Sequence, residues 1–77
     1  MPKLPVVSGK KLYNLLIKAG FAEIRRRGSH VFIESENGKL RTVIPIHGNE
    51  DLGRGLLKKI LTDLELEVAD LLKMLKE

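Results

Sequence analysis

The sequence predicts an α+β fold of the order α-β-β-β-α, with a three-stranded antiparallel sheet after the first helix and a C-terminal helix at the end. Two leucine stripes at helical spacing, one near each end of the chain, predict the helices. Two tight-turn signals between short apolar stretches predict the sheet. With 77 residues, 43% of them hydrophobic, the chain is expected to form one domain over residues 1–77 with a single thin core.

The first helix is expected over about residues 9–19. Ser8 has the side chain of a helix N-cap, and Gly20 is a stop signal at the other end. Between them, apolar residues recur at the spacing of one helix face: Leu12, Leu15, Leu16 and Ala19. This helix should therefore bury one leucine stripe.

Two turn signals set the predicted register of the three strands. Gly28-Ser29 suits a type II′ hairpin, and Asn37-Gly38 is the strongest type I′ signal in the chain. With both taken as two-residue loops, the predicted cross-strand pairs are Arg27–His30, Arg25–Phe32, Glu34–Arg41, Phe32–Val43 and His30–Pro45.

Because side chains alternate along a strand, this register divides the sheet residues between two faces. The predicted core face, on which the helices should lie, carries Ala22, Ile24, Val31, Ile33, Leu40, Thr42, Ile44 and Ile46, with Arg26 as its one misfit. The opposite face is basic and solvent-facing and carries Glu23, Arg25, Arg27, His30, Phe32, Glu34, Arg41, Val43, Pro45 and His47.

The C-terminal third is expected to be helical. Residues 48–51 form a loop whose acidic side chains suit a helix N-terminus. The apolar stripe then runs at alternating spacings of four and three through Leu57, Leu61, Leu64, Val68, Leu71 and Leu75. This pattern allows one long helix over about residues 53–76, or two helices with a break near residues 63–66, since a single long helix would overhang so small a sheet.

Charge is unevenly distributed along the chain. Residues 1–47 hold nine Lys/Arg and three Asp/Glu, whereas residues 48–77 hold five and seven. A basic N-terminal half favours an anionic partner such as nucleic acid, and the alternative is that the charge only keeps the domain soluble. The chain has no cysteine, no signal-peptide pattern and no apolar run of membrane-spanning length, so we expect a cytoplasmic location and no membrane partner.

His30 is the candidate catalytic residue. The predicted register points it to solvent with Arg27 directly opposite, and nearby cations disfavour the imidazolium form. A neutral imidazole can accept a proton, as a general base must. The alternative is a structural histidine that caps the turn or bonds the neighbouring backbone.

His47, the only other histidine, is the candidate accessory residue. The register places it diagonally from His30 on the same face, at roughly 7–8 Å between backbones. Two histidines so placed could flank a phosphodiester. No carboxylate or cysteine is spaced to complete a metal site, and no nucleotide-binding fingerprint occurs, so neither a metal nor another cofactor is expected.

Three arginines on the predicted basic face are candidate RNA contacts. Arg25, Arg27 and Arg41 carry guanidinium groups, which suit phosphate oxygens. The alternative for the run at residues 25–27 is a solvated strand edge, and this applies above all to Arg26, which the register turns toward the helices.

Phe32, Lys10 and Lys11 complete the candidate RNA-binding set. An exposed phenylalanine among cations suits base stacking or a protein partner, unless the C-terminal helix covers it. Lys10 and Lys11 lie at a helix N-terminus that could seat a phosphate. The alternative there is an ordinary cap with two solvated lysines.

Five segments together form a pattern of a known family: Pro5-Val6-Val7-Ser8-Gly9-Lys10, Ala19-Gly20-Phe21, Arg25-x-x-Gly28-Ser29-His30-x-Phe32, Thr42-Val43-x-Pro45-x-His47-Gly48 and Gly55-Leu56-Leu57-x-x-Ile60-Leu61. In these segments the chain resembles the HicA toxins. The resemblance implies an mRNA interferase with a fold similar to double-stranded-RNA-binding domains, a catalytic histidine at His30 and a HicB antitoxin that blocks the site.

The chain departs from the HicA pattern at two places. Leu56 stands where threonine is common. Residues 63–66, Asp-Leu-Glu-Leu, replace the usual glycine-containing turn, which puts the helix break there in question. Neither departure involves His30.

Three functions are compatible with these residues. The first is a metal-independent endoribonuclease in which His30 activates a ribose 2′-hydroxyl, so that DNA is not cleaved and the products carry a 2′,3′-cyclic phosphate and a 5′-hydroxyl. The second is a non-catalytic RNA-binding module that uses the same face. The third is a protein-interaction domain whose basic face docks an acidic partner.

Overall fold

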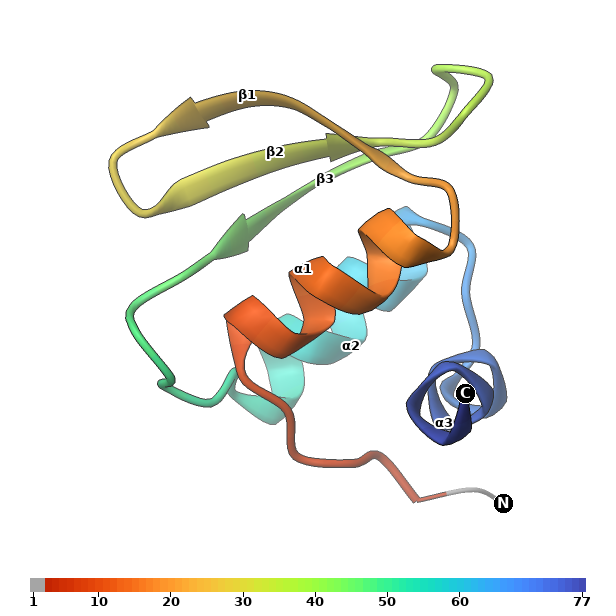
Figure 1. Ribbon diagram of the computed structural model, residues 1–77. Coiled ribbons are helices and arrows are strands. Elements are labelled where there is room, and N and C mark those ends of the chain that lie inside the picture. The colour runs from red at the N-terminus through yellow and green to blue at the C-terminus, as the bar shows by residue number, and fades with distance from the viewer. Residues whose placement is uncertain (1–2) are drawn as a thin grey trace.

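The computed structural model describes residues 3–77 and has the predicted α+β architecture (Figure 1). The elements, in chain order, are α1 (Gly9–Lys18), β1 (Ala22–Arg27), β2 (His30–Glu34), β3 (Arg41–Pro45), α2 (Arg54–Asp63) and α3 (Val68–Lys76). The three strands form one antiparallel sheet in the order β1-β2-β3. None of the helices in the described part of the chain is both long enough and apolar enough to cross a membrane.

The first helix forms where the capping signals predict it. The Ser8 side chain accepts a hydrogen bond of 3.0 Å from the Lys11 backbone N–H, and Gly20 has a φ of +111° just beyond the helix. Gly9 lies so close to the end of β3 that a Cβ there would overlap the carbonyl oxygen of Pro45. The N-terminus of α1 is thereby held against the last residue of the sheet.

The sheet register is the predicted one at all five cross-strand pairs. Arg27 lies opposite His30, and Phe32 lies between Arg25 and Val43 on the neighbouring strands. Gly28 has a φ of +57°, and Ser29 after it has a negative φ, as a type II′ turn requires.

The turn between β2 and β3 is not the predicted type I′ turn. The Gly38 N–H donates to the Ser35 carbonyl at 2.9 Å, so Glu36 and Asn37 are the central residues. Gly38 has a φ of +75°, but Asn37 does not have the positive φ that a type I′ turn would need. Asn37 contributes through its side chain instead, because Oδ1 accepts from the Lys39 N–H at 3.0 Å. The loop is wider than predicted, yet it preserves the register.

A β-bulge in β1 corrects the predicted faces at the start of that strand. Glu23 pairs with Ile33 and Arg25 with Phe32, so Ile24 is the extra residue between them. Ahead of the bulge the alternation is inverted. Ala22 and Ile24, which were predicted for the core face, are exposed, and Glu23 lies on the helix side instead of the solvent-facing side.

The bulge also explains the misfit residue Arg26. Glu23 and Arg26 now share the helix side and form an ion pair at 3.1 Å. The Tyr13 hydroxyl of α1 donates to Glu23 at 2.7 Å, and the Arg26 guanidinium lies 5.7 Å from the Tyr13 ring centroid. Hydrogen bonds from Arg26 and Tyr13 lower the pKa of Glu23. The β1 edge is thus joined to α1 by a polar cluster rather than by apolar side chains.

Both α1 and α2 lie on one face of the sheet and enclose the core (Figure 1). The largest side chains that are fully buried there are Leu12, Leu16, Val31, Ile33, Ile44, Leu57, Ile60, Leu64 and Leu71. None of the helices formed by residues 3–77 lies on the opposite face of the sheet. We call it the open face, and it carries the side chains of Arg25, Arg27, His30, Phe32, Arg41 and Val43. Since α3 lies beyond α1 and α2, away from the sheet, it does not cover Phe32.

The C-terminal third forms two helices, with the break near residues 63–66. The Leu66 N–H donates to the Leu61 carbonyl at 2.8 Å and the Glu65 N–H to the Thr62 carbonyl at 3.0 Å, which together make a Schellman motif. Glu65 occupies its left-handed position, with a φ of +55°, where glycine is usual. The break between the helices therefore forms without the usual glycine, and Glu65 adopts a strained backbone conformation in its place.

Replacing Glu65 with glycine should stabilise the protein. Relief of the left-handed conformation is worth about 1 kcal/mol, which raises the Tm of a chain of this size by roughly 4–8 °C. Thermal unfolding of Glu65→Gly against the wild type measures the effect. Glu65→Ala is the matched control, because it removes the same carboxylate but keeps the Cβ. An equal rise in Tm for both variants would mean that charge, and not backbone strain, limits stability at this turn.

Candidate functional site

His30 is the first residue of β2, and its side chain is exposed on the open face. It lies opposite Arg27 on β1 and Pro45 on β3, directly after the Gly28-Ser29 turn. The Ile46 N–H donates to the Ser29 carbonyl at 2.7 Å, which ties this turn to the chain leaving β3. The backbone around His30 is therefore fixed from both neighbouring strands.

His47 lies against the turn that carries His30. Its Nε2 atom is 3.4 Å from Ser29 Oγ, and its ring is exposed to solvent. The structure therefore brings both histidines to the same end of the sheet. The sequence interpretation used Ser29 only as a turn residue and missed its contact with His47. The predicted register contained the signal, because it places residue 46 opposite residue 29.

The three candidate arginines on the open face have different surroundings. The Arg25 guanidinium lies 4.7 Å from the centroid of the Phe32 ring. Arg41 forms an ion pair of 3.0 Å with Glu34 across the hairpin. Arg27 belongs to none of the three ion pairs found within residues 3–77. The cation opposite His30 across the hairpin thus has no counter-charge in the described part of the chain, which favours binding of an external anion.

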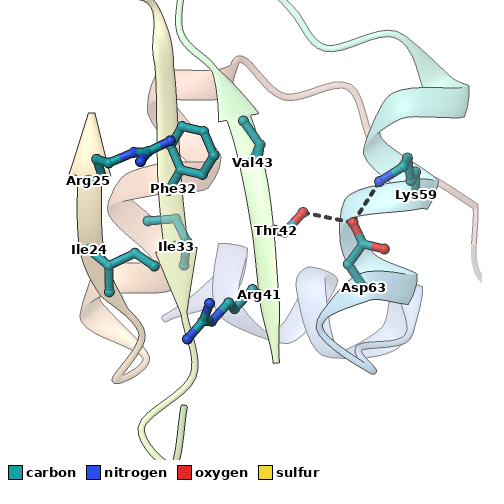
Figure 2. Close-up of a pocket in the computed structure, with 9 residues that line it drawn as sticks. All are labelled: Ile24, Arg25, Phe32, Ile33, Arg41, Thr42, Val43, Lys59 and Asp63. Carbon is teal, nitrogen blue, oxygen red and sulfur yellow. Dashed lines mark hydrogen bonds and ion pairs between the residues drawn. The ribbon is translucent and has the colours of Figure 1, made fainter. Parts of the chain in front are cut away.

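A groove of about 560 Å³ runs across the open face (Figure 2). Figure 2 shows the Arg25 side chain reaching toward the Phe32 ring at one end of it, and Asp63 and Lys59 of α2 at the other. Its lining residues are Ile24, Arg25, Phe32, Ile33, Arg41, Thr42, Val43, Lys59 and Asp63. Sequence reasoning placed Arg25, Phe32, Arg41 and Val43 on this surface and missed Ile24, Lys59 and Asp63.

Two structural features bring the missed residues to the groove, and the alternation of side chains along the strands predicts neither of them. Ile24 reaches the groove because of the bulge, and it is 45% exposed. Asp63 Oδ2 accepts hydrogen bonds from Thr42 Oγ1 at 3.0 Å and from Lys59 Nζ at 2.9 Å. Chiefly through Lys59, these bonds lower the pKa of Asp63. The Lys59–Asp63 spacing of four residues on one helix was the available signal.

Lys10 and Lys11 are not brought onto the open face. Both are exposed near the start of α1, in the helix layer on the covered side of the sheet. They do lie at the same end of the molecule as His30, because Gly9 contacts Pro45 and Pro45 pairs with His30. Their use as a phosphate seat stays a prediction. Across residues 3–77, no three or more His, Cys, Asp and Glu side chains cluster in a way that could hold a metal ion.

Comparison with known families identifies the chain. The family model for the HicA toxin of bacterial toxin–antitoxin systems matches residues 9–66, from the first residue of α1 to the turn after α2. No curated protein and no solved structure matches the chain. The matched region contains both histidines, the open face and the Schellman turn. The chain therefore belongs to the family of HicA toxins, the toxin components of bacterial toxin–antitoxin pairs.

Proposed function

We propose that the protein is an endoribonuclease that acts as a toxin by cleaving mRNA, with His30 as its general base. The observation that carries the proposal is the position of His30. It is exposed on the open face of the sheet, opposite an arginine that forms no ion pair within residues 3–77. A proton acceptor and an anion-binding cation side by side can activate the 2′-hydroxyl and stabilise the charged phosphate when a phosphodiester is cleaved by its own 2′-hydroxyl.

In the proposed reaction His30 removes the proton from a ribose 2′-hydroxyl. The 2′-oxygen attacks the adjacent phosphorus, and the bond from phosphorus to the 5′-oxygen of the next nucleotide breaks. One product ends in a 2′,3′-cyclic phosphate and the other in a 5′-hydroxyl. Arg27 and Arg25 stabilise the charge that develops on the non-bridging phosphate oxygens. Every step uses groups of the chain and of the RNA, so this route needs no metal ion.

His47 is our candidate for the general acid. The leaving 5′-oxygen needs a proton, and His47 is the second histidine at that end of the sheet, with a side chain that can supply one. Its contact with Ser29 holds the ring beside the turn that precedes His30. A base and an acid at one end of the sheet can act on opposite sides of a bound phosphate.

The proposed chemistry is tested by the products and by the requirement for the 2′-hydroxyl. We expect the wild-type protein to cleave single-stranded RNA in the presence of EDTA and to leave cyclic-phosphate and 5′-hydroxyl ends. An oligonucleotide of the same sequence made of DNA should stay intact. A requirement for a divalent metal, or products with 5′-phosphate ends, would show that a different mechanism operates.

A non-catalytic RNA-binding module that uses the open face is the alternative function. The Arg25–Phe32 stack and the unpaired Arg27 serve it equally well. It predicts RNA binding without cleavage.

In either case we propose that a HicB-like antitoxin holds the protein inactive in the cytoplasm by covering the open face. The apolar centre at Phe32 and Val43 with arginines around it suits an acidic partner.

A further inference from the structure

The groove on the open face is lined by side chains that, apart from Arg25, have no role in the proposed phosphate chemistry. Its wall combines the Arg25–Phe32 stack with apolar side chains, and its far end is polar. We propose that it binds one unpaired nucleobase of a single-stranded RNA, beside the phosphate that His30 acts on. This inference rests on the proposed function only in taking RNA as the ligand.

The aromatic end of the groove can hold the face of a base. Phe32 is half-buried in the centre of the sheet, which fixes its ring, and Arg25 lies over that ring at 4.7 Å. Bases stack both on aromatic rings and on guanidinium planes. A base can therefore extend this stack. Ile24 and Val43 add apolar surface on the two outer strands, and Ile24 does so only because of the bulge.

The polar end of the groove can contact the edge of the same base. The hydrogen bonds of Asp63 within residues 3–77 go to Oδ2, so Oδ1 is available to accept from a base N–H. Lys59 is exposed beside it and can donate to a base carbonyl or a phosphate. The volume of about 560 Å³ lies within the range of about 300–1,000 Å³ that is usual for small-ligand pockets.

Charge favours RNA as the occupant. The cations around the groove are Arg25, Arg41 and Lys59, with Arg27 further along the same face. Two acids, Glu34 and Asp63, lie near them, and each is already in an ion pair with one of these cations. The surface thus keeps an excess of positive charge next to a partly apolar recess that is large enough for a base, and this combination binds single strands.

The groove lies close to the proposed catalytic histidine. Phe32 and His30 are two residues apart on β2 and point to the same face, so their backbones are about 7 Å apart. A base bound on Phe32 would therefore place a phosphate of the same strand near His30. In a duplex the bases are paired and stacked inside the helix and are not available to the groove. The recess thus selects single-stranded RNA, in contrast to the duplex binding that a double-stranded-RNA-binding fold would suggest.

Abasic scanning tests the proposal. The full chain carrying His30→Ala, which should cleave RNA far more slowly than the wild type, is titrated with short single-stranded RNAs that each lack one base, with the unmodified strand and with its duplex. Loss of the base that occupies the groove should weaken binding by roughly 5- to 100-fold. Loss of other bases should have little effect. The duplex should bind more weakly than the single strand.

Phe32→Ala on the same background identifies the groove as the place where that base binds. It should weaken binding of the intact strand by a similar factor and leave binding of the critical abasic strand unchanged. Because it removes a stacking contact and not a charge, the dependence of affinity on salt should keep its slope. Phe32→Leu keeps apolar bulk at this position and replaces Phe32→Ala in the titration if the alanine variant does not fold. Lys73→Ala on α3 is the matched surface control.

The possible results separate the two proposals. A protein that binds no RNA at low salt would contradict the proposed function itself. If RNA binds but every abasic strand binds equally well, or the duplex binds as tightly as the single strand, then the nucleobase site is wrong while RNA binding stands. A base-dependent affinity that Phe32→Ala does not change would place the base elsewhere and would also overturn the inference.

Discussion

RNA cleavage by His30→Ala should be slower than cleavage by the wild type by roughly 10²–10⁴-fold, the range expected when a general base is lost. The rate is measured under single-turnover conditions in EDTA, so that binding and product release do not mask the chemical step. The fold should not change, because the His30 side chain is exposed and makes no hydrogen bond with any side chain of residues 3–77. The Tm of the variant should therefore match that of the wild type.

Two further variants make this result specific. His47→Ala should also slow cleavage, and the double variant should be little slower than the slower single variant, because an acid and a base that act on one phosphate are not additive. Lys73→Ala, on α3 and away from the sheet, should cleave at the wild-type rate. Normal cleavage by His30→Ala would exclude His30 as the base. The open face would then still bind the RNA, but another group would act as the base.

Charge reversal at Arg25 and Arg27 should weaken RNA binding and antitoxin binding together, each by more than about tenfold. Both ligands are proposed to use the open face. The double variant replaces the cation that stacks on Phe32 and the one that faces His30. Both affinities are measured at one fixed salt concentration, because the RNA affinity depends steeply on salt.

The matched control is the double reversal Lys73→Glu and Lys76→Glu. It changes the net charge by the same amount but on α3, beyond the helix layer. If it weakens RNA binding as strongly, then the overall charge matters and not the position of the arginines. If the variant at Arg25 and Arg27 loses RNA binding but keeps antitoxin binding, the antitoxin docks away from the open face and does not inhibit by covering it.

The sequence was sufficient to predict the sheet because the register depends on local turn chemistry. Gly28 has to adopt a positive φ, and this fixes the pairing of His30 with Arg27. The loop at Asn37-Gly38 is wider than predicted but is centred on the same two residues, so the pairing of Glu34 with Arg41 was still correct. The face on which His30 lies followed from that register alone.

The remaining part of the site depended on contacts between elements, which the sequence pattern does not specify. The bulge at Ile24 brings Glu23 to the same side of the sheet as Arg26, where the two form an ion pair. The hydroxyl of Tyr13 on α1 donates a hydrogen bond to Glu23 there. The alternation of side chains along a strand, from which the faces were predicted, does not reveal such an inserted residue. Likewise, Asp63 reaches the groove because it bonds Thr42 across the edge of β3. The end of α2 at this point depends on Glu65 accepting a left-handed conformation.

The bulge in β1 also bears on whether the edge of the sheet can pair with another molecule. An outer strand with unpaired backbone groups is a template for a strand of another molecule, and such strands polymerise unless something prevents it. In β1 the extra residue Ile24 interrupts the regular spacing of those groups, and three successive arginines repel a second copy. On the opposite edge α2 lies beside β3, where Asp63 bonds Thr42. Strand addition at either edge is therefore disfavoured, which leaves the open face as the surface of the sheet that a partner could reach.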